Sequence, residues 1–344
     1  MSSSSSSSSL ASEIYLTILL SDISTQFNRY ISIIILLFGT IGNFLNCLVL
    51  SQPSLKSNPC AFFFLISSIA NIISIISGLS TRILAGWNLD VTMTDTLSCK
   101  FRAYIMFVSR TIAFWLIALA TVDRWCSSCN QYQRRKMSSL RNAQKGSIII
   151  IILCSLIYCQ IFYCYDANLI DTPLQCYGKT VICRFITDIT YAFITVICPI
   201  LIMSIFGLMT ISNIRQTYSV ILSKKDVNNR NSRCRRTLTM TCAQRERWRR
   251  IDRYLRHVLF RQVILLTLLT LPQMIEKLYT TITVNTKKSS LHITIDAFVY
   301  NIVLLLSFAA SGMPFYIYTL SGGSIFRTTF LKLLQSLYKK LKCQ

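Results

Sequence analysis

The sequence has little charge, little histidine and no glycine-rich binding loop. Asp, Glu, Lys and Arg make up 14% of the 344 residues, whereas soluble domains average about 25%. The two histidines, His257 and His292, fall at opposite ends of the apolar region and cannot bind one metal ion together. The sequence contains no phosphate-binding loop or dinucleotide motif. These absences argue against an enzyme, a metal site and a bound cofactor.

Hydrophobic residues, in contrast, make up 52% of the chain. They gather in seven continuous runs of about 20 residues, the length at which a helix crosses the ~30 Å hydrocarbon core of a bilayer. The runs lack the two-residue alternation of barrel strands, which favours helices. The expected fold is therefore all-α, a seven-transmembrane helix bundle. Its predicted spans are Tyr30–Leu50, Cys60–Leu79, Phe101–Val122, Ser147–Cys164, Ile186–Ile214, Val258–Tyr279 and Ile293–Tyr318.

Basic residues concentrate on one side of this predicted bundle. Most of the 36 Lys and Arg lie in the first, third and fifth connections and in the C-terminal tail, whereas most acidic residues lie on the other side. Because basic loops stay in the cytoplasm, we expect a multi-pass plasma membrane protein with its N-terminus outside. The lipid bilayer then accounts for the net charge of +23, and nucleic acid is not expected as a partner.

Composition divides the chain into three parts. Residues 1–27 are Ser-rich and predict a disordered extracellular tail. Residues 28–322 form the membrane domain, with a basic cytoplasmic loop at about 215–256, and residues 323–344 predict an amphipathic helix at the membrane surface. Two roles remain open for the arginines of Arg245–Arg256: they could anchor the chain to anionic lipid or form a protein-binding site.

The cysteines predict one disulfide bond. Most of the 14 fall in spans or on the cytoplasmic side, where thiols stay reduced. Cys99, Cys176 and Cys183 lie on the outer side, so Cys99 can be joined to the loop after the fourth span. Cys176 is the preferred partner because Cys183 lies almost in the next helix, and Cys183 remains the alternative. Cys126 and Cys129 lack the second half of a zinc or redox motif, which favours reduced thiols or acylation.

Asp123, Arg124 and Trp125 form the sequence "DRW" at the end of the third span. Arg124 follows Cys99 by about 37 Å of helix, so it reaches the cytoplasmic face. A solvated Asp-Arg pair there contributes only a few tenths of a kcal/mol. A partner on another helix would change this, and Asp252, shortly before the sixth span, is the candidate.

The order and spacing of several motifs resemble the rhodopsin-like (class A) G-protein-coupled receptors, including invertebrate peptide receptors and orphan members. Besides "DRW", the matching features are Asn43 in "GTIGN", Asn71 in "ANIIS", Pro199, Pro272, and Pro314 in "GMPFYIY". The resemblance covers residues 28–340. It implies that Arg124 is held by Asp123 and Asp252 at rest, and is freed when the sixth helix swings out and a heterotrimeric G protein binds. Pro272 removes a helical hydrogen bond and so permits the kink.

Departures from the family pattern affect both sodium binding and signalling. Asn71, Ala113 and Met313 stand where the family has polar sodium ligands, so we expect weak or absent sodium modulation. Further family switch positions hold Thr270, Gly207 and Ile317. Signalling through substitute residues and poor signalling both remain open.

Arg110 is the main candidate on the ligand side. It lies about 16 Å below Cys99, near the bilayer centre, where a charge costs at least ~2.5 kcal/mol and suggests function. Binding of a ligand anion and a structural role, with carbonyls, water or Gln273 as acceptors, are equally open. Met106 stands where amine receptors of the family carry Asp, so a small peptide is the preferred ligand. The predicted pocket residues are Arg102, Met106, Arg110, Gln273, Lys277 and Tyr300.

A seven-helix transporter or channel, or a receptor-like protein without G-protein coupling, is the alternative. Against a transporter, the sequence shows no internal repeat, no pair of broken helices and no acidic residues at membrane depth.

Overall fold

A computed structural model describes residues 3–129, 131–169, 174–228, 242–283, 286, 288–320, 328, 330, 331 and 335. Side chains are described within these ranges except at residues 3–10, 54, 214–259 and 318–320. The described chain is almost entirely helical. Its elements are α1 Ser3–Gln26, η1 Phe27–Ile31, α2 Ser32–Leu50, α3 Pro53–Lys56, α4 Pro59–Gly86, η2 Val91–Met93, α5 Thr96–Ser128, α6 Tyr132–Met137, α7 Leu140–Tyr158, α8 Ile161–Cys164, β1 Tyr165–Asp166, β2 Tyr177–Gly178, α9 Val181–Thr190, η3 Tyr191–Ile197, α10 Cys198–Asn228, α11 Cys242–Ile282, α12 Ser290–Gly312 and α13 Pro314–Leu320.

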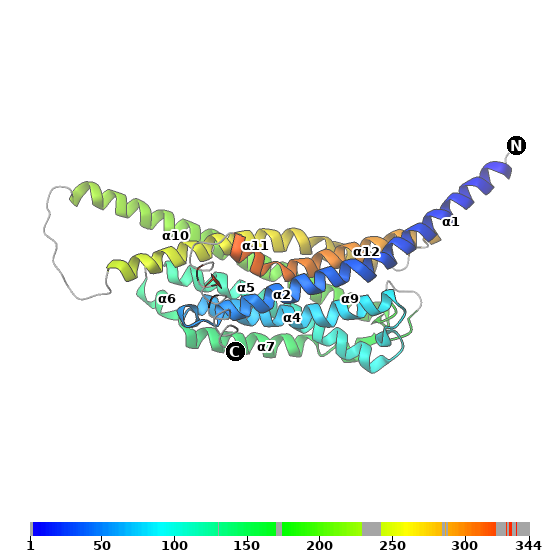
Figure 1. Ribbon diagram of the computed structural model, residues 1–344, viewed down its shortest axis with the longest axis horizontal. Coiled ribbons are helices and arrows are strands. Elements are labelled where there is room, and N and C mark those ends of the chain that lie inside the picture. The colour runs from blue at the N-terminus through cyan, green and yellow to red at the C-terminus, as the bar shows by residue number, and fades with distance from the viewer. Residues whose placement is uncertain are drawn as a thin grey trace.

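Seven stretches of the described chain are long and apolar enough to cross a membrane, in agreement with the sequence. They lie side by side in an elongated bundle, with α1 projecting at one end and α10 and α11 at the other (Figure 1). α5 is the central helix, since it contacts α4, α7 and α10. The seven stretches are Ala11–Leu50, Pro59–Gly86, Thr96–Ser128, Leu140–Cys164, Val181–Asn213, Phe260–Ile282 and Ser290–Gly312.

The first of these stretches overlaps the segment for which a disordered tail was expected. The helix begins at Ser3 and runs into the first span, so residues 3–26 are helical. Its last turns pack on α12: Asn301 donates a 2.6 Å hydrogen bond to Ser24 Oγ, and the rings of Phe27 and Phe298 lie 6.2 Å apart. This packing explains the helical end of the segment, which the serine content did not reveal.

The expected basic loop at 215–256 is also largely helical. α10 continues to Asn228 and α11 begins at Cys242, and residues 229–241 lie outside the described part. Pro272 lies inside α11 without ending it. The predicted amphipathic helix at 323–344 falls outside the described residues, apart from four positions.

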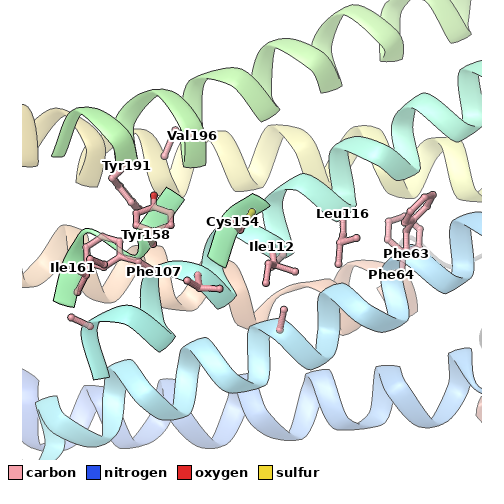
Figure 2. Close-up of a cluster of buried hydrophobic side chains, with 14 of the residues drawn as sticks. Phe63, Phe64, Phe107, Ile112, Leu116, Cys154, Tyr158, Ile161, Tyr191 and Val196 are labelled. Atoms are coloured by element: carbon pink, nitrogen blue, oxygen red, sulfur yellow. The ribbon is translucent and has the colours of Figure 1, made fainter. Parts of the chain in front are cut away.

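The bundle core is a cluster of aromatic and aliphatic side chains around α5, part of which is drawn in Figure 2. Phe107 of α5 contacts the rings of Tyr158 and Tyr191 at 5.5 and 5.8 Å. Because lipid surrounds a membrane bundle, such close packing and buried hydrogen bonds, more than exclusion from water, hold the helices together.

Small side chains bring α2 and α12 close together. A Cβ on Gly312 would lie 2.8 Å from Gly39 Cα, so the two backbones touch at these glycines. Beside them, Asn43 donates a 3.0 Å hydrogen bond to the Ser311 carbonyl. Asn43 thus joins the first and seventh spans, while Asn71 is buried in α4.

A π-helical segment, η3, precedes Pro199 in the fifth span. Proline has no N–H to donate to the carbonyl four residues earlier, and wider helical turns are one way to accommodate this loss. η3 places the Thr195 hydroxyl 2.6 Å from both Thr111 and Tyr158. The fifth span is thereby tied to α5 and α7.

Candidate functional site

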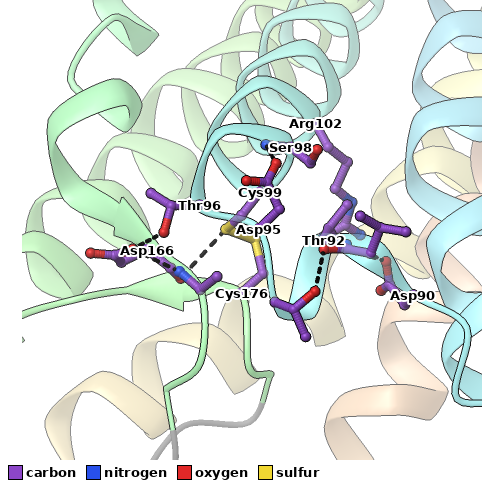
Figure 3. The surroundings of a disulfide bond; sticks show 12 residues. Asp90, Thr92, Asp95, Thr96, Ser98, Cys99, Arg102, Asp166 and Cys176 are labelled. Atoms are coloured by element: carbon purple, nitrogen blue, oxygen red, sulfur yellow. Dashed lines mark hydrogen bonds between the residues drawn. A yellow bond between two sulfur atoms is a disulfide. The ribbon is translucent and has the colours of Figure 1, made fainter.

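Two disulfide bonds mark one end of the bundle, hereafter the disulfide end. Cys99 at the start of α5 bonds to Cys176, with their Cα atoms 5.7 Å apart (Figure 3). Cys183, the alternative partner in the sequence prediction, bonds to Cys164 instead. The expectation that Cys164 stays reduced within the fourth span was therefore wrong. α7 ends at Tyr158, and the short helix α8 carries Cys164 to the strand that follows.

The strands β1 and β2 form a two-stranded antiparallel sheet over this end. Tyr165 pairs with Gly178, and Asp166 pairs with Tyr177. Asp166 also accepts a 2.6 Å hydrogen bond from Thr96 (Figure 3), and this bond holds the pKa of the Asp166 carboxyl below its usual range. The sheet is thus attached to α5 by a disulfide and a hydrogen bond.

A narrow crevice lies beneath the sheet. All six pocket residues predicted from the sequence line it. The open space between the side chains is about 20 Å³, room for about one water molecule. A larger ligand must therefore displace side chains to enter. The lining residues are Arg82, Arg102, Ala103, Met106, Phe107, Arg110, Tyr165, Leu174, Cys176, Tyr177, Tyr191, Gln273, Lys277, Tyr300 and Leu304.

Arg110 lies at the bottom of this crevice with 2% of its surface exposed. Its Nη1 donates a 3.1 Å hydrogen bond to Gln273 Oε1, which also accepts from the Tyr191 hydroxyl at 2.8 Å. Its guanidinium lies 4.4 Å from the centre of the Phe308 ring. Gln273 is therefore one acceptor for Arg110, as the structural alternative proposed, but it engages only one of the guanidinium nitrogens.

Lys277 is the best-compensated cation of the crevice. Its Nζ lies 2.7 Å from Asp188 Oδ1, and both side chains are at most 3% exposed. The other Asp188 oxygen accepts hydrogen bonds from the hydroxyls of Thr281, at 2.5 Å, and Tyr177, at 3.2 Å. Asp188 thus links α9 to α11 and to the sheet.

Arg82 was missed by the sequence reasoning, which ended the second span at Leu79. It is 5% exposed, and its Nη1 donates a 3.3 Å hydrogen bond to Asn301 Oδ1. Arg102, one turn below Cys99, donates to the carbonyls of Ser77 and Gly78 at 3.3 and 3.5 Å. The two arginines bring the second, third and seventh spans together around the crevice.

The Asp123–Arg124 pair lies at the opposite end, hereafter the Arg124 end. Arg124 Nη2 is 2.8 Å from Asp123 Oδ2, and the side chains are 6% and 7% exposed. The same nitrogen donates a 3.0 Å hydrogen bond to Asn58 Oδ1 at the start of α4. Ser138 donates to the other Asp123 oxygen at 2.6 Å. The pair is therefore buried and hydrogen-bonded, unlike a solvated surface pair.

Asn58 and Ser138 escaped the sequence reasoning because they lie in connections, and Asn58 also reads as an ordinary helix cap. The side chain of Asp252, the expected partner on the sixth helix, lies outside the described residues. The Trp125 ring packs at 5.0 Å against Phe206 of α10. Nearby, Asn213 donates to Ser128 Oγ and to the thiol of Cys129, so the end of α5 also contacts α10 through polar groups.

A second cavity of about 420 Å³ lies between α5, α10 and α11. Its lining includes Thr121, Arg124, Met203, Gly207 and Val263 and is mostly apolar. Apart from its own helical turns, no described atom lies within 4 Å of where a Gly207 Cβ would be. The absence of a side chain at Gly207 therefore helps to keep the space beside Arg124 open.

Three residues occupy the positions where the resemblance places sodium ligands in related receptors. Met313 is partly buried at the junction of α12 and α13, Ala113 is buried, and Asn71 supplies an amide. Within the described residues, no three His, Cys, Asp or Glu side chains gather in a way that could hold a metal ion.

Comparison with known proteins adds one distant similarity. No family model matches the chain. A stretch of it is 25% identical, over 138 aligned residues, to the FMRFamide peptide receptor frpr-18 of Caenorhabditis elegans. The alignment covers 37% of this chain and 30% of that receptor, so less than a third of the relative's length is spanned. The seven described helices that could span a membrane, together with this similarity, are the features of a multi-pass plasma membrane protein.

Proposed function

We propose that the protein is a rhodopsin-like receptor that binds a small extracellular peptide and activates heterotrimeric G proteins. The disulfide end is then extracellular and the Arg124 end cytoplasmic. The observation that carries the proposal is the Asp123–Arg124 pair, buried at the edge of a cavity between the third, fifth and sixth spans. A protein helix can occupy such a cavity once α11 moves outward.

The contacts of Arg124 suit a switch. Asp123 and Asn58 hold its guanidinium beside α5 and α4. Two states that differ by a few kcal/mol can exchange when a partner binds one of them more tightly. Pro272 in α11 interrupts the helical hydrogen bonding and lowers the cost of bending the sixth span. The G protein would stabilise the state in which Arg124 leaves Asn58.

The peptide assignment has two supports. The similar receptor is named for a peptide ligand. The crevice at the disulfide end also offers varied polar groups from several helices, as recognition of a peptide requires.

The test is G-protein activation in cells that express the wild type or Arg124→Ala at matched surface levels. It is measured without ligand and with a peptide library across the main Gα classes. We expect a peptide-evoked signal that Arg124→Ala reduces at least tenfold. Equal signals from the two proteins would remove Arg124 from the mechanism. Ligand-evoked current or uptake without G-protein involvement would support the transporter or channel alternative instead.

A further inference from the structure

The crevice at the disulfide end contains three arginines on two neighbouring helices. Arg82 lies near the end of α4, while Arg102 and Arg110 lie two turns apart on α5. A helix rises ~1.5 Å per residue, so these two Cα atoms are about 12 Å apart along α5. Arg82 and Arg110 are at least nine-tenths buried. The three guanidinium groups thus form a positively charged wall from the mouth of the crevice to its bottom.

No carboxylate among the described lining residues balances this charge. Asp188 is paired with Lys277, and its second oxygen is occupied by Thr281 and Tyr177. Asp90, in the connection after α4 (Figure 3), is not part of the lining; it interacts electrostatically with Arg82 and Arg102, but one carboxylate cannot balance three guanidinium groups. One Asp90 oxygen accepts from the N–H and the hydroxyl of Thr92. Positive charge therefore remains in a buried site, which is costly without an anion.

Two of the arginines have the same edge of the guanidinium open, meaning that neither nitrogen on that edge has a hydrogen-bond acceptor. The Nε and Nη2 atoms of both Arg82 and Arg110 are buried and have no hydrogen-bond acceptor among the described residues. These two nitrogens lie on one side of the planar group and point their N–H bonds in parallel. This is the edge that binds both oxygens of a carboxylate. The third nitrogen, Nη1, already donates a hydrogen bond, to Asn301 in Arg82 and to Gln273 in Arg110.

The neighbours of Arg110 hold this open edge in place. Phe308 supports one face of the guanidinium, and Phe308 in turn fits against Gly78, where an added Cβ would lie 2.1 Å from the ring. Gln273 is fixed by Tyr191. A donor that is oriented before binding loses less entropy when a ligand arrives.

We propose that this crevice binds a ligand carboxylate through the open edges of Arg82 and Arg110, with Arg102 at the mouth. The inference rests on the proposed receptor function and narrows the ligand to an acidic one, either a peptide with an acidic group or a small organic acid. A neutral ligand would leave the buried cations uncompensated, and a cationic ligand would be repelled.

The first test measures binding without a G protein. The melting temperature of the full-length receptor in lipid nanodiscs is measured with three kinds of probe. The first is a set of pools of acetylated, amidated tetrapeptides that contain Asp or Glu. The second is a set of matched pools in which Asn or Gln replaces the acid, and the third is glutarate. We expect the acidic pools to raise Tm above the amide pools, because each carboxylate gains charge-assisted hydrogen bonds.

The affinity of the acidic pools should fall about ten- to hundredfold in Arg82→Gln and Arg110→Gln. Lys100→Gln, which removes a positive charge outside the crevice lining, should bind like the wild type.

The outcomes separate the ligand sources from the receptor proposal. Stabilisation by glutarate alone would support the acid site and count against the peptide ligand. Equal effects of acidic and amide pools, or no effect of any probe at millimolar concentration, would overturn the inference. Neither result depends on whether Arg124 couples to a G protein.

A second measurement uses the unliganded receptor. If Arg82 and Arg110 hold uncompensated charge for a ligand, Arg82→Gln and Arg110→Gln should leave the Tm unchanged or raise it. If both arginines are structural, each substitution should lower the Tm by several degrees, and the inference would fail.

Discussion

Asn58 has two contacts at the Arg124 end, and substitutions can separate them. Its side-chain oxygen accepts the backbone N–H of Cys60, which caps α4, and also accepts from Arg124. Asn58→Ala removes both contacts, so we expect a loss of about 1 kcal/mol in stability from the cap and higher basal G-protein activation. Asn58→Asp keeps the cap and binds Arg124 with a full negative charge, which should lower basal activation.

Basal signalling at matched surface expression and Tm in detergent check this pair of variants. Ser289→Ala is the control, since Ser289 caps α12 at the disulfide end and does not contact Arg124. It should lower the Tm without raising the basal signal. Basal activation that changes in the same direction in Asn58→Ala and Asn58→Asp would show that the Asn58–Arg124 contact does not restrain the switch.

The buried Asp188–Lys277 pair makes a second prediction at the residue scale. Lys277→Met leaves the Asp188 carboxylate buried without its cation, which should cost about 3–5 kcal/mol. Asp188→Asn with Lys277→Met removes both charges, and the Thr281 and Tyr177 hydroxyls can still donate to the Asn carbonyl. The double variant should therefore melt at a higher temperature than Lys277→Met. Additive losses in Tm would mean that the two side chains are not energetically coupled.

Two glycines in membrane helices should respond oppositely to the same substitution. In α4, a Cβ on Gly78 would lie 2.1 Å from Phe308, so Gly78→Ala overpacks the site at a cost of about 1–3 kcal/mol. In α10, nothing in the described part of the chain outside the glycine's own helical turns lies within 4 Å of a Cβ on Gly207, so Gly207→Ala should stabilise the helix by about 0.5–1 kcal/mol. Thermal unfolding of both variants in one detergent measures the contrast. Tm shifts of the same sign would contradict it.

Elements with a long apolar run could be predicted from the sequence, and their interruptions could not. All seven spans were found because crossing a bilayer sets their length. The end of α7 at Tyr158 was missed because apolar and aromatic residues continue through Cys164, so nothing local signals the break. The helical turns just before Phe27 were not expected because they are held by packing on α12, which composition does not encode.

The same contrast holds for individual site residues, some of which could be predicted from the sequence while others could not. The six predicted pocket residues line one crevice, and their positions along the helices and their depth below Cys99 already brought them to the same level of the bundle. Arg82 and Asn58 were missed because their roles depend on which helices become neighbours. The second disulfide needed the same information, since Cys164 and Cys183 are brought together by the sheet between α8 and α9.

For the whole molecule, two independent features predict the same orientation in the membrane. Disulfide bonds form in oxidising compartments, and both described here lie at the same end of the bundle. Most Lys and Arg belong to connections at the other end, which the positive-inside rule assigns to the cytoplasm.

An epitope tag before Met1 should therefore be stained on intact cells, and a tag after Gln344 only after permeabilisation. Staining of both tags only after permeabilisation at normal expression would indicate an intracellular protein. Staining of the C-terminal tag alone on intact cells would invert the bundle and exclude both the proposed extracellular crevice and the proposed coupling to cytoplasmic G proteins.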